Sequence, residues 1–199
     1  ACTRTSGRNP GTSICMPGCA RAVDPAPRCR LLARDDAARF RDFRLAGLKE
    51  SPLAFGSSFE DERDLPLAHF AGRVTPTATS WLLGAFASAD ELAGCLGWYR
   101  DTGRKTAHKG HLWGMYVAPA WRGRGIARGL LAEALARCAR EPGLVQVELL
   151  VSVDNVPAAN LYAAAGFRRA AVLPRSLLLG GRFVDDLLMV LDVADIRPA

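Results

Sequence analysis

The chain has 199 residues and a formal net charge of +6, with 26 Lys and Arg residues against 20 Asp and Glu residues. This length is typical of one domain with an appendage. A composition of 49% hydrophobic and 23% charged residues excludes a wholly disordered or collagen-like chain. Gln146 and Glu148 interrupt the longest apolar run, so no segment approaches the roughly 20 apolar residues of a membrane helix, and we expect no membrane partner.

The positive charge is concentrated near the start of the sequence. Residues 1–30 hold five arginines and one aspartate, which leaves the rest of the chain only mildly basic. A surface that follows nucleic-acid phosphates needs a denser basic patch than this. We therefore expect no nucleic acid among the partners.

Residues 1–28 differ from the rest in composition. They are rich in Thr, Ser, Gly, Pro and Arg and show no apolar periodicity, which predicts a flexible N-terminal extension before a single domain at residues 29–199. The short apolar stretch at 14–16 is followed at once by Pro17 and Gly18, which is unlike a secretory signal. A cytoplasmic location is expected.

The six cysteines fall into two groups. In the first, the spacing of Cys15, Cys19 and Cys29 offers neither a CxxC pair nor a nearby histidine, so we expect no metal site. Cys95 and Cys138 lie in apolar patterns instead and are predicted to be small core residues.

Hydrophobic periodicity and breaker residues predict the elements in chain order. The first part of the chain predicts a strand at 31–32, a helix opened by Asp35 and Asp36 and ended by Ser51 and Pro52, a polar loop at 52–66, a short helix at 67–74 and strands at 80–87, 91–100 and 110–117. The second part predicts a helix at 126–140, a strand at 145–153, a helix at 157–165 and strands at 168–173 and 183–193. The order is a mixture of α and β elements without an internal repeat.

The segment from Trp121 to Gly129 carries the clearest chemical signal. Its small residues let the backbone approach a ligand, and the free amides at the start of the following helix favour a phosphate group. Arg122, Arg124 and Arg128 add charge-assisted donors, which suits a pyrophosphate better than a single carboxylate. An arginine-rich turn with a purely structural role is the alternative.

Three kinds of phosphate loop compete for this segment. A Walker loop needs Gly-Lys followed by Ser or Thr, and the segment has no lysine, so an NTPase is excluded. A dinucleotide fold, and with it a nucleotide-dependent oxidoreductase, fits the spacing of the glycines, but residues 119–122 separate the strand from the first glycine. The third kind is a coenzyme A loop.

Three spaced blocks carry a resemblance to the GNAT superfamily of N-acetyltransferases. Arg122-x-x-Gly125-x-Ala127 resembles its Arg/Gln-x-x-Gly-x-Gly/Ala loop. Residues 115–119 are similar to its fourth strand, and residues 155–167 to its Asn, Leu-Tyr and Gly-Phe segment. The resemblance covers about residues 30–193 and implies an α/β (α+β) fold with a mixed, largely antiparallel sheet of about six to seven strands flanked by helices.

The same resemblance implies a site for acetyl-CoA as cosubstrate, with no metal. The amides of the loop would hold the pyrophosphate, the edge of the 115–117 strand would pair with the pantetheine arm, and the Met115 amide would polarise the thioester carbonyl. The implied cofactor-binding residues are Met115, Tyr116, Val117, Arg122, Gly123, Arg124, Gly125, Ile126, Ala127, Arg128 and Asn155. Asn155 either bonds the pantetheine or caps the last helix.

Tyr162 is the leading catalytic candidate, because the resemblance places there a tyrosine that protonates the leaving thiolate. Core packing is the alternative for this tyrosine, and we expect Leu161 to supply the inward packing instead. An amine acceptor with a pKa near 10.4 is mostly protonated at pH 7, so a base or a water relay is needed as well.

Two residues are candidates for that base. Period-two alternation predicts that His111 shares a face with Met115 and Val117, which aims its imidazole toward the thioester. Glu148 interrupts an apolar strand and is a second candidate through water. For both, a structural role is the alternative. The acidic cluster at 60–64, with Asp185 and Asp186, would attract a cationic amine or form a solvated face.

The sequence thus predicts an N-acetyltransferase that moves an acetyl group from acetyl-CoA to a primary amine of a small molecule or protein by direct attack. The alternative is a non-catalytic acyl-CoA-binding sensor, which would keep the loop and strand edge without needing Tyr162. A homodimer is compatible with the sequence, although no sequence feature establishes one.

Overall fold

The computed structural model describes residues 27–196. Apart from its last residues, the predicted extension at 1–28 lies outside this range, and the first strand begins at Arg28, one residue before the predicted domain boundary. The strands are β1 Arg28–Leu31, β2 Ser80–Phe86, β3 Leu92–Arg100, β4 Lys109–Val117, β5 Gln146–Ser152, β6 Arg168–Leu179 and β7 Arg182–Asp192. The helices are α1 Ala37–Glu50, α2 Phe59–Glu62, α3 Leu67–Val74, α4 Ile126–Cys138 and α5 Val156–Ala164.

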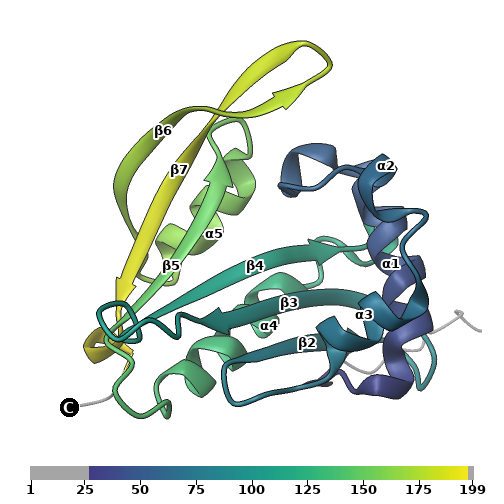
Figure 1. Ribbon diagram of the computed structural model, residues 1–199, viewed down its shortest axis with the longest axis horizontal. Coiled ribbons are helices and arrows are strands. Elements are labelled where there is room, and N and C mark those ends of the chain that lie inside the picture. The colour runs from purple at the N-terminus through teal and green to yellow at the C-terminus, as the bar shows by residue number, and fades with distance from the viewer. Residues whose placement is uncertain (1–26, 197–199) are drawn as a thin grey trace, which may run out of the picture.

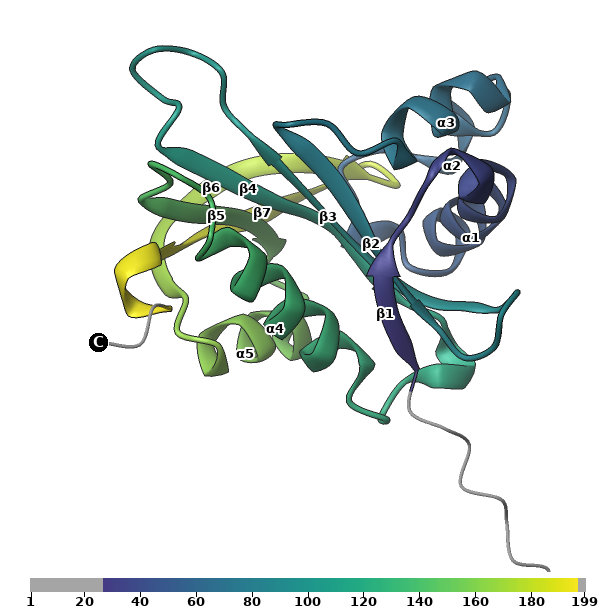
Figure 2. The same cartoon turned by 90° about the horizontal axis from the view of Figure 1, so that it is seen from below.

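The seven strands form one sheet in the order β1-β2-β3-β4-β5-β7-β6. All neighbouring strands are antiparallel except β4 and β5, which are parallel. Helices α1 to α3 lie on one side of the sheet and α4 and α5 on the other (Figures 1 and 2). The predicted mixed, largely antiparallel sheet flanked by helices is therefore confirmed.

The two sides of the sheet have separate apolar cores. The larger core lies under α4 and α5 and includes Leu130, Leu149 and Met189. The smaller core lies under α1 and α3 and includes Phe40 and Phe70. Cys138 is buried in the larger core and Cys95 in the smaller one, so the prediction that both are core residues is confirmed.

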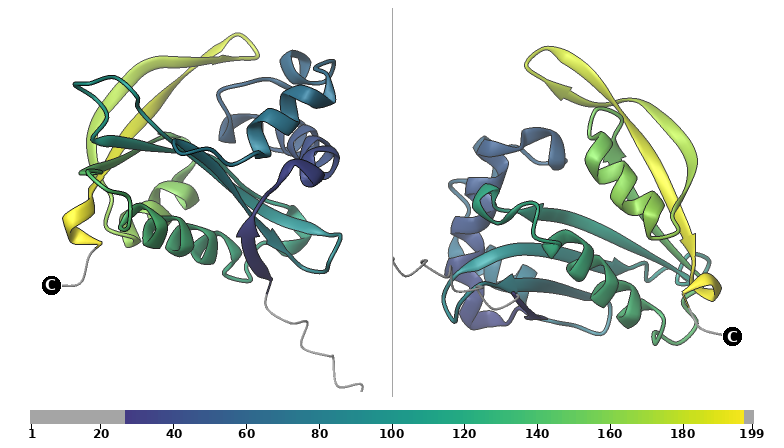
Figure 3. Two further views of the ribbon diagram at one scale, coloured as in Figure 1. Left: turned by 60° about the horizontal axis from the view of Figure 1, so that its bottom comes forward. Right: turned by 180° about the vertical axis from the view of Figure 1, so that it is seen from behind.

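Strands β4 and β5 diverge along their length. They pair only over residues 109–112 of β4 and 146–149 of β5, and beyond that point the backbone of β4 has no partner on this edge among the described strands. The hairpin of β6 and β7 continues the divergence and projects away from β2 to β4 (Figure 3). The sheet thus opens between its fourth and fifth strands at the end where the chain passes into the glycine-rich loop.

A β-bulge lies in β4 at this opening. Gly97 pairs with Trp113 and Cys95 pairs with Tyr116, so two residues, Gly114 and Met115, oppose Leu96 alone. Gly114 has a φ of +63°, a conformation that glycine adopts without strain. The bulge reverses the inward and outward alternation for the rest of the strand.

The helix predicted to open at Asp35 and Asp36 is confirmed: a 3-10 turn at Arg34–Asp36 leads into α1, and Asp36 is its N-cap residue, although the Asp36 side chain bonds Arg30 and makes no cap bond. Two other element predictions need correction. The predicted polar loop at 52–66 contains a 3-10 turn at Pro52–Ala54 and helix α2, which Ser58 caps through a bond from the Asp61 amide. Strand β6 continues past residue 173 to Leu179 after an irregular register.

Within residues 27–196, no helix is long and apolar enough to cross a membrane.

Candidate active site

A narrow cavity of about 90 Å³ occupies the opening between β4 and β5. We call it the cleft. Met115 of β4, Asn155 and Tyr162 all line it. The structure thus brings Met115 together with two residues at least 40 positions later in the chain, and the sequence predicts all three in one site. From the other side of the sheet, Trp113 and the segment 53–56 line it too. The cleft therefore joins the two faces of the sheet.

Tyr162 lies on α5 and reaches the cleft from the side of the larger core. Its side chain is buried, and its ring packs edge-on against Phe167 with ring centroids 5.9 Å apart. The expectation that Leu161 supplies the inward packing in place of Tyr162 is wrong, since Leu161 is only half-buried. Burial raises the pKa of the Tyr162 hydroxyl to about 12. This tyrosine therefore keeps its proton at neutral pH.

Asn155 caps helix α5. Its Oδ1 accepts a hydrogen bond of 3.3 Å from the Ala158 amide, which satisfies one of the free donors of the first turn. The capping alternative for this residue is thus observed. Asn155 also lines the cleft, so the N-terminus of α5 lies at the cleft.

The glycine-rich loop forms a shallow cavity of about 390 Å³ at the start of α4. Gly123 and Gly125 adopt left-handed conformations with φ of +74° and +78°, and Gly125 is the N-cap of the helix. The residues that line this cavity are Val117, Trp121, Arg122, Gly123, Gly125, Ile126, Ala127, Arg128 and Leu161. Free amides of a 13-residue helix thus face a hollow that β4 borders at Val117.

Arg122 lines this hollow, but its guanidinium is already bonded within the chain. Its Nη1 and Nη2 donate to the two carboxylate oxygens of Glu50 at 3.0 and 2.6 Å, and its Nε donates to the Val117 carbonyl. Glu50 also accepts a bond of 3.2 Å from the Tyr116 hydroxyl. Hydrogen bonds from Arg122 lower the pKa of Glu50. Arg122 therefore ties the loop to the end of α1.

The other two loop arginines differ from each other. The guanidinium of Arg124 lies over the Trp121 ring, 4.6 Å from its centroid. Arg128 is exposed on the first turn of α4, lines the hollow and forms no ion pair with another residue of the described chain. Of the three, Arg128 is the one that the structure leaves available to an anion.

His111 and Glu148 lie side by side but outside the cleft. They are paired in the register of β4 and β5, with His111 Nδ1 3.8 Å from Glu148 Oε2. Lys109 Nζ lies 2.8 Å from Glu148 Oε1, and the Gln146 amide donates to the same oxygen at 2.6 Å. His111 stacks on Tyr99 with ring centroids 4.6 Å apart. Both predicted bases are thus occupied with neighbouring side chains.

The prediction that His111 shares a face of the sheet with Met115 and Val117 is also wrong. Leu112, Met115 and Val117 pack toward α4 and α5, whereas Trp113 and Tyr116 pack toward α1 and α3. Because the bulge at Gly114 adds one residue, His111 shares the side of Trp113 rather than that of Met115. A simple period of two could not reveal this.

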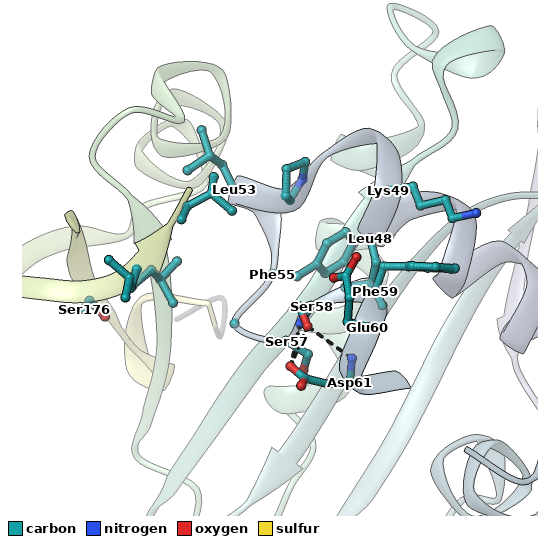
Figure 4. A pocket seen from close by; sticks show the side chains of 15 residues that line it. Leu48, Lys49, Leu53, Phe55, Ser57, Ser58, Phe59, Glu60, Asp61 and Ser176 are labelled. Atoms are coloured by element: carbon teal, nitrogen blue, oxygen red, sulfur yellow. Dashed lines mark hydrogen bonds between the residues drawn. The ribbon is translucent and has the colours of Figure 1, made fainter. Parts of the chain in front are cut away.

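A larger cavity of about 560 Å³ opens on the face of α1. We call it the acceptor pocket. One wall is residues 48–61, from the end of α1 to α2, and the other is residues 176–179 of β6, as Figure 4 shows. Leu53, Phe55, Gly56 and Leu177 line both this pocket and the cleft, so the two cavities adjoin each other.

The acidic residues at 60–64 do not form one site with Asp185 and Asp186. Glu62 is buried between Arg44 and Arg73, at 2.8 and 3.1 Å. Burial alone would raise its pKa, but hydrogen bonds and charge from Arg44 and Arg73 lower it to about 2. Asp185 accepts a bond from the Arg175 amide, and Asp186 is buried on β7, where it lines the cleft rather than the pocket that Glu60 and Asp61 line. Most of the predicted acidic cluster is therefore structural or solvated.

Sequence reasoning missed two groups that shape the site. Glu50 holds Arg122 from 72 positions away, and Arg44 anchors Glu62 while its guanidinium lies 4.3 Å from the centroid of the Phe55 ring. Both act through contacts distant in sequence, which no local pattern signals. In residues 27–196, no group of three or more His, Cys, Asp or Glu side chains could hold a metal ion.

A sheet opened between a bulged β4 and β5, with a glycine loop at the start of the next helix, defines the fold of the GNAT acetyltransferases. A sequence model of the acetyltransferase (GNAT) family matches residues 45–167, more than half of the chain. The chain belongs to this family.

Individual relatives are more distant. The L-amino acid N-acetyltransferase AaaT of Escherichia coli (strain K12) is 33% identical over 72 residues, 36% of this chain and 44% of that protein. Phosphinothricin N-acetyltransferase of Alcaligenes faecalis is 35% identical over 75 residues, 38% of each chain. The chain thus spans less than half the length of these curated relatives. The structure of a GNAT acetyltransferase from Streptococcus pneumoniae superposes with a TM-score of 0.73 at 22% identity, covering 83% of this chain and 98% of that one, which shows the shared fold.

Proposed function

We propose that the protein transfers the acetyl group of acetyl-CoA to the primary amine of a small acceptor. The observation that carries this proposal is the succession of three cavities along β4: Val117 borders the hollow at the start of α4, Met115 lines the cleft, and the cleft shares four lining residues with the acceptor pocket. The first suits a pyrophosphate, the second an extended amide-containing arm, and the third a small molecule.

The loop and the edge of β4 bind acetyl-CoA in this proposal. Amides of the Gly123–Ala127 segment and the guanidinium of Arg128 hold the pyrophosphate at the positive end of the α4 dipole. The unpaired edge of β4 from Trp113 to Val117 offers its backbone groups to the two amides of pantetheine. Met115 lies at the bulge and lines the cleft. Its backbone amide would donate a hydrogen bond to the thioester carbonyl and polarise it.

Tyr162 serves as the general acid. An acceptor that arrives as an ammonium group first gives one proton to water. When the neutral nitrogen then forms its bond to the acetyl carbon and the carbon–sulfur bond breaks, the nitrogen releases a second proton to water and the thiolate gains one from the Tyr162 hydroxyl. Solvent then restores the proton to the tyrosine. A hydroxyl whose pKa burial raises to about 12 is fully protonated beforehand, as this role requires. His111 and Glu148 would act as the base only through water, since neither lines the cleft.

A small amino acid or related amine is the acceptor class that we favour. The names of both curated relatives described above specify acceptors of this kind, L-amino acids and phosphinothricin. The acceptor pocket, with apolar walls from Leu48, Phe55 and Phe59 and a volume of about 560 Å³, is of a size for such a molecule. A protein N-terminus is the second candidate, because the pocket opens to solvent at the exposed end of the β6–β7 hairpin.

The test is thiol release from acetyl-CoA by the purified chain with a panel of L-amino acids, phosphinothricin and spermidine. We expect amine-dependent release that falls by about 100-fold or more in Tyr162→Phe, because a positioned proton donor usually contributes on the order of 10² to 10⁴ in rate. Asn160→Ala, at an exposed position of the same helix that lines none of the three cavities, should leave the rate nearly unchanged. Coenzyme A binding without turnover on any amine would favour the sensor, and absence of coenzyme A binding would overturn both.

A further inference from the structure

Four carboxylates are buried in the described part of the chain: Asp36, Glu62, Glu148 and Asp186. The first three each have a lysine or arginine within 3 Å, namely Arg30 for Asp36, Arg44 for Glu62 and Lys109 for Glu148. Asp186 is different. It is 6% exposed, and no cationic side chain among residues 27–196 pairs with it. Burying a carboxylate without a counter-charge costs free energy, so this residue needs an explanation.

The hydrogen bond of Asp186 is neutral. Its Oδ2 accepts a bond of 2.6 Å from the Ser176 hydroxyl, which comes from the irregular part of β6. The Ser176 hydroxyl brings no positive charge, so no side chain among residues 27–196 supplies a counter-charge to this carboxylate. Asp185, one position earlier, holds the same irregular segment by accepting from the Arg175 amide, but it does not line the cleft.

Asp186 lies where the acceptor pocket meets the cleft. Ser176 lines the acceptor pocket and Asp186 lines the cleft, so the bond between them spans the junction of the two cavities. Figure 4 places Ser176 across the pocket from Phe55 and Glu60. A molecule that passes from the acceptor pocket to Met115 reaches this junction.

Asp186 also lies on the opposite side of the sheet from Tyr162. Leu187, Met189 and Leu191 of β7 pack into the larger core with Tyr162, so Asp186, which precedes Leu187 by one residue, faces the side of α1. This places a negative charge on the face from which an amine would attack. The proton donor for the thiolate is on the other face.

We propose that Asp186 binds the protonated amine of the acceptor and fixes its approach to the cleft, a role that rests on the proposed function. The ammonium group supplies the counter-charge that the fold omits, which gives preference to cationic amines over neutral nucleophiles. Ser176 is a positioning residue in this arrangement, because it orients the carboxylate through Oδ2 and leaves Oδ1 to the ligand.

Asp186→Asn is the informative variant, because an amide oxygen still accepts from Ser176 while the charge is lost. With each amine of the panel, we expect KM for the amine to rise about 10- to 100-fold, the usual effect of losing one charge-assisted hydrogen bond. KM for acetyl-CoA should stay within about twofold, since the loop and the edge of β4 are untouched. Thermal melting of each variant checks that the fold is retained.

A matched variant separates the charge of Asp186 from the hold of this segment on β6. Asp185→Asn removes the neighbouring charge outside the cleft, on a residue that holds the same irregular part of β6 through the Arg175 amide. We expect Asp185→Asn to keep KM for the amine within about threefold of the unsubstituted protein, whereas Ser176→Ala, which removes the positioning bond but keeps the charge, should raise that KM by a smaller factor than Asp186→Asn. If Asp185→Asn matches the loss in Asp186→Asn, the effect comes from holding β6 and the proposal is overturned.

Calorimetric titration of each amine into the protein–coenzyme A complex gives a readout that does not need turnover. Amine binding that weakens in Asp186→Asn supports the site even if no thiol is released, in which case only the proposed function fails. Turnover with unchanged amine affinity in Asp186→Asn overturns the site and leaves the function standing. No binding of any amine to the unsubstituted complex overturns the site as well.

Discussion

The buried pair of Glu62 and Arg44 makes a quantitative prediction about stability. Glu62→Gln keeps the size of the side chain but leaves the Arg44 guanidinium, 6% exposed, without its charged partner. The pKa of Glu62 falls from an ordinary 4.5 to about 2 in the fold. At 1.36 kcal/mol for each pH unit, this difference corresponds to about 3 kcal/mol of folding free energy at pH 7. Loss of one partner of a buried ion pair costs a similar amount.

The pH dependence of this loss has a definite sign. Because the pKa of Glu62 is lowered on folding, its contribution is fully present above the unfolded value of 4.5 and declines as the pH falls toward 2. The difference between Glu62→Gln and the unsubstituted chain should therefore shrink from about 3 kcal/mol at pH 7 to about 2 kcal/mol at pH 3.5.

Urea unfolding at the two pH values measures this difference directly, and thermal melting at pH 7 should show a Tm lower by about 6 to 12 °C. Glu60→Gln is the matched control, because Glu60 is exposed on the same short helix. It should change stability by less than about 0.5 kcal/mol. A loss in Glu62→Gln that is below 1 kcal/mol, or that does not change with pH, would refute the reasoning from the buried charge.

Two further predictions concern the loop before α4. Gly125→Ala places a Cβ in open space but at a φ of +78°, so backbone strain should lower stability by about 1 kcal/mol and weaken coenzyme A binding. Gly129→Ala also places its Cβ in open space, but inside the helix, and should raise stability by about 0.5 to 1 kcal/mol. Urea unfolding compares the two, and equal effects would contradict the role of the left-handed loop. Arg128→Ala should weaken coenzyme A binding about five- to tenfold in calorimetry at low salt, and less at high salt. Arg137→Ala, whose guanidinium pairs with Glu133 on the same helix, should leave that affinity unchanged, and a salt-independent loss in Arg128→Ala would argue against a phosphate contact.

The order and kind of most elements could be predicted because each depends on local pattern. The helix that carries Leu130, Leu131 and Leu135 and the strand that carries Val147, Leu149 and Val151 show their buried faces as simple periods, and both were placed within two residues. The glycine loop was recognisable because positive φ at Gly123 and Gly125 restricts which residues fit. Constraints of this kind involve only residues close together in the sequence, so the sequence alone is enough to predict them.

The parts of the site that could not be predicted depend on distant contacts. One extra residue at Gly114 changed the side that His111 faces, and no property of the neighbouring residues marks a bulge before the partner strand is known. Arg122 looked like a free donor because Glu50, its partner, is 72 positions away. Asp185 and Asp186 are identical in sequence terms, yet only Asp186 lines the cleft, because alternation along β7 separates them.

The opening between β4 and β5 leaves the sheet incomplete. Among residues 27–196, the register of β4 and β5 holds four residue pairs, and the amides of Val145 and Gln146 add bonds to the His108 carbonyl at the same end. The two halves are also held together by apolar side chains of the larger core, such as Leu112, Leu149 and Leu187. A cosubstrate whose arm lies along β4 would occupy the place of the missing strand segment and bridge the halves through its own amides. Such a cosubstrate would be a structural element as well as a reactant, because a ligand that binds only the folded chain raises its stability.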